Sequence, residues 1–99
     1  MKVINIKSKE SYDLYVGRKN SHYGLPESKW HNPFRLEDHN NDRQKVCDLY
    51  ESYIRNGPLW NELEELDGLV LACWCMPKLC HGSILIKLLN EKKLSKIFE

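Results

Sequence analysis

The sequence lacks any long apolar run. No stretch of the 99 residues approaches the roughly 18 consecutive apolar residues that a membrane-spanning helix requires. The N-terminal residues 1–7 also lack the apolar core of a secretory signal peptide. We therefore expect a cytoplasmic protein with no membrane partner.

An excess of charge of one sign is also absent. Fifteen Lys and Arg residues stand against fourteen Asp and Glu residues, which leaves a formal net charge of +1. This balance gives no electrostatic reason to expect a nucleic acid as the partner. Aromatic residues make up 10% of the chain, which is enough to nucleate a core and argues against disorder. The composition predicts one folded domain over residues 1–99 and leaves the oligomeric state open, a homo-oligomer included.

A regular cysteine framework is the third absence. The chain has four cysteines, and no two of them are spaced as C-x-x-C. In the cytoplasm, cysteines are more often thiols, metal ligands or reactive groups than parts of a disulfide scaffold. Three of the four lie within eight positions, from Cys73 to Cys80. We therefore expect the chemistry of the chain to be concentrated in residues 73–82.

Three apolar segments have the length of strands. Residues 3–6 and 12–16 are short and rich in β-branched and aromatic side chains. Residues 69–73 form a continuous apolar run bounded by Gly68 and Pro77. Such a run is typical of a central strand that is covered on both faces.

Apolar residues at helical spacing predict helices after the second strand. Asn41 is expected to cap the first of these, with Gln44 as its capping-box partner. Pro58 ends that helix and suits the first position of the next one. The remaining C-terminal segments are expected to be a third helix over residues 81–90 and a solvated basic tail over residues 91–99.

These elements predict a small α/β fold. We expect a two-layer or three-layer sandwich with a short, mostly parallel sheet and about three helices. In such folds, ligands bind past the carboxyl ends of the strands. The turn that follows residues 69–73 lies at such an end.

A long loop between the second strand and the first helix is the first candidate region. Residues 17–40 show no apolar period, and ordered loops of this length in small domains are usually functional. Arg18 and Arg35 could grip a phosphate or carboxylate in bidentate fashion. Trp30 or Phe34 could stack on a flat ring. The plainer alternatives are a surface position for Arg35 and a core position for Phe34.

The cysteine-rich turn is the second candidate region. Cys80 is expected at the N-terminus of the third helix, where backbone N–H groups lower the pKa of a thiol. His81, Gly82 and Ser83 could then present hydrogen-bond donors to an anion, and Gly82 would let the ligand approach the backbone closely. Trp74 would point to the opposite side from Cys73 and Cys75.

Two other interpretations of the same turn stay open. Cys73, Cys75, Cys80 and His81 together could complete a tetrahedral zinc site. Alternatively, Cys73, Trp74 and Cys75 could be plain core residues, as we expect for Cys47 on the first helix.

Several motifs make the chain similar to the DUF4326 family, whose members are small domains of unassigned function in bacteria and bacteriophages. The Cys-Trp-Cys…Cys-His-Gly pattern is the most specific part of the match. The chain departs from the usual family pattern at His31, where the family has Gly, and at Ser83, where it often has an acidic residue. The matching residues are 15–18, 32–34, Gly68, 71–75, Pro77, 80–82 and Leu85. The resemblance implies that the following residues act together: Gly17, Arg18, Asn32, Cys73, Cys75, Cys80 and His81.

The sequence leads to one main functional hypothesis. A pocket between residues 17–35 and residues 73–82 is expected to bind a small anionic, nucleotide-like molecule. Cys80 or His81 could act there as a nucleophile or proton carrier, and the sequence leaves open whether the protein is an enzyme or a binder. The bacteriophage occurrence that the resemblance implies suggests a counter-defence role in the cytosol of a bacterial host. The alternative is a zinc-stabilised interaction module, and a thiol–disulfide redox protein is a third, weaker interpretation.

Overall fold

The fold is built on a three-stranded parallel sheet. The structure, a computed structural model, describes residues 1–74 and 78–97. The strands are β1 (Lys2–Asn5), β2 (Leu14–Tyr15) and β3 (Val70–Cys73), arranged in the order β1-β3-β2. Both neighbours of β3 run parallel to it. The continuous apolar run therefore forms the central strand, as its composition predicted.

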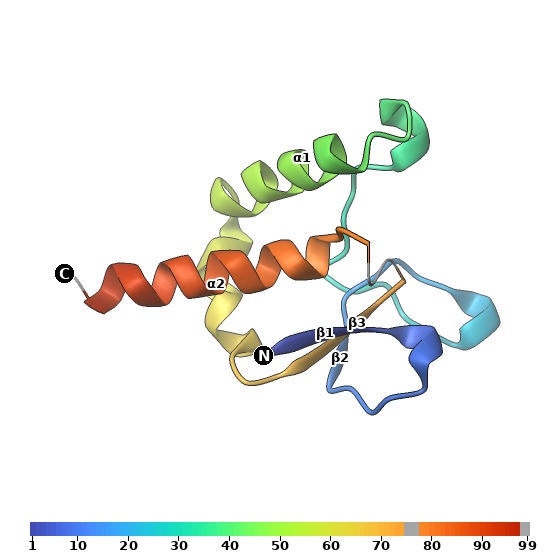
Figure 1. Ribbon diagram of the computed structural model, residues 1–99, viewed down its shortest axis with the longest axis horizontal. Coiled ribbons are helices and arrows are strands. Elements are labelled where there is room, and N and C mark those ends of the chain that lie inside the picture. The colour runs from blue at the N-terminus through green and yellow to red at the C-terminus, as the bar shows by residue number, and fades with distance from the viewer. Residues whose placement is uncertain (75–77, 98–99) are drawn as a thin grey trace.

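Two α-helices cover one side of this sheet. They are α1 (Arg43–Arg55) and α2 (His81–Ile97). Helix α2 packs on β1 and β3, and α1 packs on α2 at a greater distance from the sheet (Figure 1). Shorter 3₁₀ helices fill the connections, namely η1 (Ile6–Ser8), η2 (Ser21–Tyr23), η3 (Leu36–His39) and η4 (Pro58–Leu66). The small α/β fold predicted from the sequence is confirmed, and both α-helices lie on the same side of the sheet.

The opposite face of the sheet carries a second, smaller apolar cluster. Ile4, Tyr15 and Ala72 are buried on it, and Leu25 and Trp74 pack against them. Because β3 is buried on both faces, each of its side chains belongs to one of the two cores.

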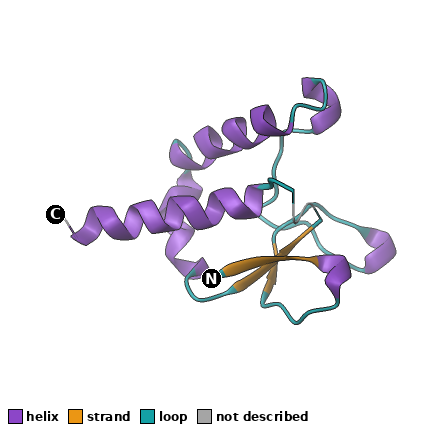
Figure 2. Cartoon of the chain, viewed as in Figure 1, coloured by secondary structure: helices purple, strands orange, loops and turns teal. Residues whose placement is uncertain are grey.

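The carboxyl ends of the strands and the amino ends of both α-helices meet at one end of the molecule. In Figure 1 this end lies opposite the C-terminus of the chain. The loop that follows β2 runs through the same region (Figure 2). Residues that are far apart in sequence are thereby brought to the edge where α/β folds bind ligands.

Helix α1 begins one residue later than predicted. Asn40 and Asn41 both adopt left-handed backbone conformations, with φ of 55° and 58°. Asp42 is then extended, and its carboxylate accepts a hydrogen bond from the Lys45 N–H at 3.0 Å. The prediction of Asn41 as the cap was wrong, because the left-handed turn makes Asp42 the first residue that can turn its side chain back onto the helix.

This assignment of the cap can be tested by substitution. We expect Asp42→Ala to lower the free energy of unfolding by about 1 kcal/mol, because the first turn loses a hydrogen-bond acceptor. Asn41→Gly is the control, since glycine keeps the left-handed backbone and removes the side chain. Urea denaturation of both variants measures the effect. An equal loss of stability in Asn41→Gly would contradict the assignment.

The C-terminal part of the chain is more ordered than its composition predicted. Helix α2 continues to Ile97 instead of ending at Asn90. Lys92 donates to the Trp60 carbonyl at 2.5 Å, and Lys93 donates to Asp67. These partners lie in and just after η4, so the basic residues of the predicted tail extend the helix instead of forming a solvated segment.

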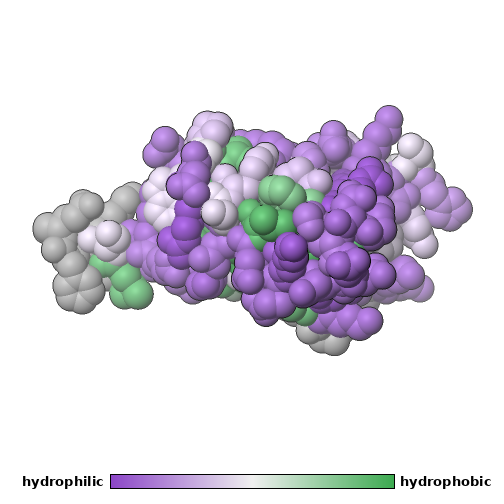
Figure 3. All heavy atoms as spheres, turned by 90° about the horizontal axis from the view of Figure 1, so that it is seen from above, coloured by the Kyte–Doolittle hydropathy of each residue, from purple (hydrophilic) through white to green (hydrophobic). Residues whose placement is uncertain are grey.

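The face of the molecule above α1 is largely hydrophilic. Figure 3 shows the face above α1, where hydrophilic side chains dominate and apolar residues gather in a small area near the middle. Within residues 1–74 and 78–97, no helix combines the length and apolar character needed to cross a membrane.

Candidate functional site

A pocket opens where the carboxyl ends of the strands meet the amino ends of the helices. Its volume is about 330 Å³. Its walls come from the loop after β2, the first turn of α1, and the segments that flank the turn between β3 and α2. The structure brings these sequence-predicted residues together on its walls: Gly17, Arg18, Asn32, Phe34, Trp74, Cys80 and His81.

Two predicted residues of the long loop lie elsewhere. Trp30 is only 1% exposed and belongs to the main core, and its indole N–H donates to Glu65 at 3.1 Å. It cannot stack on a ligand in this pocket. Arg35 is exposed and pairs with Glu37 at 3.6 Å. It therefore occupies the surface position that we gave as the alternative to ligand binding.

Cys80 occupies the amino end of α2. The N–H groups of Ser83 and Gly82 donate hydrogen bonds to its sulfur, and the Cys73 sulfur lies 3.2 Å away. The hydrogen bond from Cys73, followed by those from the backbone, lowers the pKa of the Cys80 thiol to about 6 although burial opposes the shift. The lowered pKa favours the thiolate form of Cys80 at neutral pH, in which its sulfur accepts from the Cys73 S–H.

Gly82 and Ser83 do not line the pocket as we expected. A Cβ at Gly82 would lie 2.9 Å from Val3 Cγ1, so glycine is needed there for the close approach of α2 to β1. The Ser83 hydroxyl lies 3.9 Å from the Cys80 sulfur. Because the N–H groups of both residues hold Cys80, the thiolate itself takes the place at the helix terminus that we predicted for a ligand anion. Cys73 is fully buried behind Cys80.

His81 is held in one orientation and one tautomer. Its Nε2 lies 2.5 Å from the Val16 carbonyl oxygen, which can only accept, so Nε2 carries the proton and Nδ1 is an acceptor. The Tyr50 ring packs against the imidazole in a T-shaped arrangement, with 5.2 Å between centroids. Burial lowers the pKa of His81 and outweighs the opposing effect of the Val16 hydrogen bond. A neutral imidazole is thus the resting state beside Cys80.

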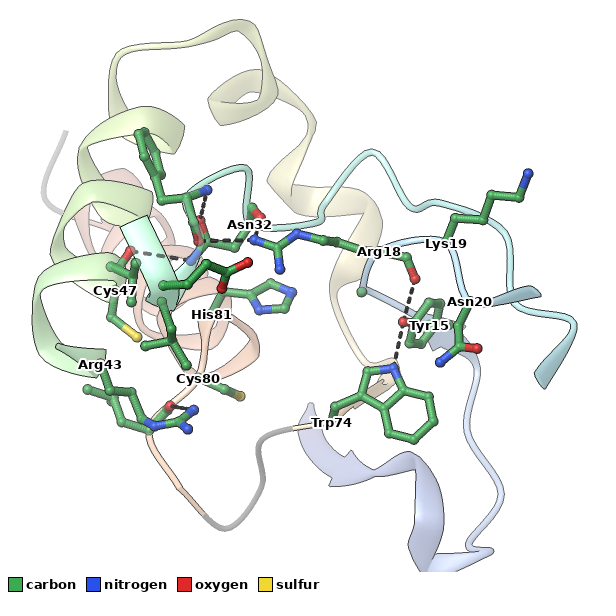
Figure 4. Close-up of a pocket in the computed structure, with 16 residues that line it drawn as sticks. Tyr15, Arg18, Lys19, Asn20, Asn32, Arg43, Cys47, Trp74, Cys80 and His81 are labelled. Atoms are coloured by element: carbon green, nitrogen blue, oxygen red, sulfur yellow. Dashed lines mark hydrogen bonds between the residues drawn. The ribbon is translucent and has the colours of Figure 1, made fainter. Parts of the chain in front are cut away.

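Arg18 and Asn32 hold the long loop in place. Arg18 Nη2 donates to the carbonyls of Asn32 and Phe34 at 2.6 and 3.0 Å. The Asn32 side chain donates to the Val46 carbonyl at 3.3 Å and accepts from the Phe34 N–H. In Figure 4 the Arg18 side chain reaches from the loop toward His81. Arg18 therefore both positions the loop and contributes positive charge to the pocket.

Trp74 is fixed by a chain of hydrogen bonds. Its indole N–H donates to the Tyr15 hydroxyl at 2.8 Å, which donates to the Arg18 carbonyl at 2.6 Å (Figure 4). A Cβ at Gly17 would lie 2.3 Å from that hydroxyl oxygen. Glycine at position 17 is thus required for the Tyr15 side chain to reach across the loop. This network gives a physical reason for glycine at position 17.

Several residues that line the pocket were missed by the sequence analysis. Arg43 is the first residue of α1, and its Nη1 lies 3.5 Å from the Leu79 carbonyl. Lys19 adds a further cation and Glu37 an acid, while Cys47 is buried in the core and also reaches the pocket. The topology gave a signal for Arg43. A helix that follows a parallel strand begins at the end of the sheet where that strand finishes, so the first residue of α1 is expected near the carboxyl ends of the strands.

The residues of the zinc hypothesis are brought together only in part. The sulfurs of Cys73 and Cys80 are in contact, whereas His81 directs Nε2 to the Val16 carbonyl and Cys75 lies outside the described residues. Across the part of the chain that the structure describes, no group of three or more His, Cys, Asp and Glu side chains is arranged to hold a metal ion.

Comparison with known proteins gives a family but no characterised relative. No curated protein and no solved structure matches the chain. The family described as "Domain of unknown function (DUF4326)" matches residues 4–91, which include the end of β1, the whole of β2, β3 and α1, and the first part of α2. The motifs at Gly17-Arg18 and Cys80-His81 lie inside the matched range. The chain belongs to the DUF4326 family.

Proposed function

We propose that the protein binds a small anionic, nucleotide-like molecule in the pocket between the loop after β2 and the start of α2. The observation that carries the proposal is the composition of the walls, which combine cationic and aromatic side chains around a volume of about 330 Å³. That volume lies at the lower end of the range for small-molecule sites, so it suits a ligand of mononucleotide size better than a larger one.

Positive charge supports the anionic part of the ligand. Arg18, Lys19 and Arg43 line the pocket, against one carboxylate from Glu37 and the thiolate of Cys80. Lys19 extends away from the others in Figure 4, so the two arginines are the groups best placed to hold a phosphate.

Aromatic side chains support the flat part of the ligand. Trp74 and Phe34 are both half-buried and both line the pocket, so each retains surface that a ring can cover. The hydrogen bond from Trp74 to Tyr15 fixes the indole, which lowers the entropy lost when a ring stacks on it. On this proposal, Trp74 stacks on the ring of the ligand, which is the role that the sequence analysis gave to Trp30.

The thiolate gives this pocket the capacity for covalent chemistry. Cys80 is a nucleophile at neutral pH, and the neutral His81 beside it could carry a proton through Nδ1. On this proposal, the protein either modifies its ligand or sequesters it. The phage occurrence that the family resemblance implied would fit the sequestration or destruction of a signalling nucleotide of the host.

Two arginine variants test the proposed binding. We expect Arg43→Gln to weaken the binding of nucleotides by at least about tenfold, because a charge-assisted hydrogen bond is worth roughly 1.5–3 kcal/mol. Arg35→Gln is the matched control, since Arg35 carries the same charge and lies in the segment before α1 but does not line the pocket. Calorimetric titration with ribonucleoside monophosphates, their cyclic forms and the free nucleosides measures the effect.

Other results of this titration would contradict the proposal. If no nucleotide in the panel gives a binding isotherm with the wild type, the pocket does not bind this class. Equal losses in Arg43→Gln and Arg35→Gln would show that only overall charge matters. Free nucleosides should bind more weakly than their phosphates, because they lack the group that the arginines hold.

A zinc-stabilised interaction module is the second proposal, and the contact between the Cys73 and Cys80 sulfurs favours it. Metal analysis of protein purified without chelator separates the two proposals. Zinc at one ion per chain, together with unfolding on addition of EDTA, would favour the module. Metal-free folded protein would favour the ligand pocket.

A further inference from the structure

We infer that Cys73 and Cys80 form a reversible disulfide when a peroxide enters the pocket, and that this disulfide removes Cys80 as the reactive group of the site. The two sulfurs come from different elements, the end of β3 and the residue before α2, and they lie 3.2 Å apart. A disulfide bond is about 2.05 Å long, so the sulfurs need to approach by only about 1.2 Å. The proposed pair is thus not the pair of cysteines in the C-x-C motif at residues 73–75.

The two cysteines are in different surroundings, which gives each a separate part in the reaction. Both side chains are buried, but Cys80 keeps 2% of its surface exposed and lines the pocket through which a small oxidant enters, whereas Cys73 is 0% exposed and does not line it. Figure 4 shows Cys80 on the pocket wall between Arg43 and Trp74. Cys73 takes part in the reaction through its contact with the Cys80 sulfur. Cys80 is therefore the residue that is oxidised first, and Cys73 is the one that resolves it.

The chemistry balances with hydrogen peroxide as the oxidant. The Cys80 thiolate attacks one peroxide oxygen, the O–O bond breaks, and the released hydroxide takes up a proton to give water and a sulfenic acid on Cys80. The Cys73 sulfur then attacks the sulfur of that sulfenic acid, and the proton of the Cys73 thiol leaves with the hydroxyl group as a second water. In total, two thiols lose two electrons and two protons, and one peroxide becomes two waters.

Peptide mapping of the oxidised protein tests this inference. The protein, freed of metal with a chelator, is treated with hydrogen peroxide, its thiols are counted, and its disulfides are located by mass spectrometry. We expect two of the four thiols to be lost per chain, a single linkage between Cys73 and Cys80, and full recovery with dithiothreitol. Because no ligand is needed, failure of this experiment would be independent of failure of the proposed function.

Variants separate the two roles of the cysteines. Cys73→Ser should leave the Cys80 sulfenic acid unresolved, so dimedone should label Cys80 in this variant but not in the wild type. Cys47→Ala is the control, because Cys47 also reaches the pocket, and we expect it to retain the linkage. A linkage that involves Cys75, or irreversible oxidation of Cys80 in the wild type, would overturn the inference. No loss of thiols would overturn it as well.

Discussion

Substitution of Trp30 by alanine is expected to lower the free energy of unfolding by about 3–5 kcal/mol, the usual cost of deleting a buried tryptophan. The side chain is 1% exposed and lies in the main core. The backbone carbonyl of Trp30 accepts a hydrogen bond from the buried Tyr50 hydroxyl at 2.7 Å, and this bond connects the long loop to α1. Since small domains are stable by only about 5–15 kcal/mol, we expect a large fall in melting temperature.

Trp74 supplies the comparison for this prediction. Trp74→Phe keeps an aromatic ring and loses the hydrogen bond to Tyr15, so we expect a smaller loss of stability than in Trp30→Ala and weaker binding of a nucleotide ligand. Thermal unfolding and ligand titration of both variants measure the two effects. If Trp30→Ala were as stable as the wild type, the packing of the long loop on the core would be wrong.

The order of the elements could be predicted because the relevant signals are local. The apolar run of β3 is bounded by turn residues and covered on both faces, so its central position followed from composition. The length of α2 could not be predicted in this way. It depends on Lys92 and Lys93, whose acidic partners lie on η4 and just after it. A basic sequence alone does not reveal acidic groups that approach only after folding.

The candidate site could be predicted only where a motif adjoins the end of an element. Gly17-Arg18 follows a strand and Cys80-His81 begins a helix, and the structure places both on the pocket. The aromatic residues of a loop have no periodicity. Nothing in the pattern therefore distinguished Trp30, which is buried in the core, from Phe34, which lines the pocket. Arg43 was missed because a single charged residue in a first helical turn resembles any other surface residue.

The pairing of Cys73 with Cys80 was also beyond the sequence. Spacing suggested that Cys73 and Cys75 would share a face of an extended chain, and Cys75 lies outside the described residues. What brings Cys80 to Cys73 is the packing of α2 on β1 and β3, which Gly82 permits by its close approach to Val3. Contacts of this kind depend on the tertiary fold and have no signature in local spacing.

The stability of the protein is expected to depend on pH through Cys80. Its pKa falls from the ordinary thiol value of 9.0 in the unfolded chain to about 6 in the folded protein. A lowered pKa of an acid stabilises the folded state above the unfolded pKa, and that stabilisation is lost as pH falls through the folded pKa. The free energy of unfolding should therefore rise as pH increases from 6 to 9, because the unfolded chain binds a proton that the folded chain does not.

Cys80→Ser isolates this effect with little change to the fold. Serine is a good helix cap, so its hydroxyl can accept the same N–H groups of Gly82 and Ser83 without titrating. We expect urea denaturation in the presence of chelator to show that the wild type gains stability relative to the variant between pH 6 and 9. Thiolate absorbance should locate the same transition near pH 6 in the wild type alone. Parallel pH profiles of the two proteins would mean that Cys80 remains a neutral thiol, and the pocket would then have neither its nucleophile nor the group that a peroxide oxidises first.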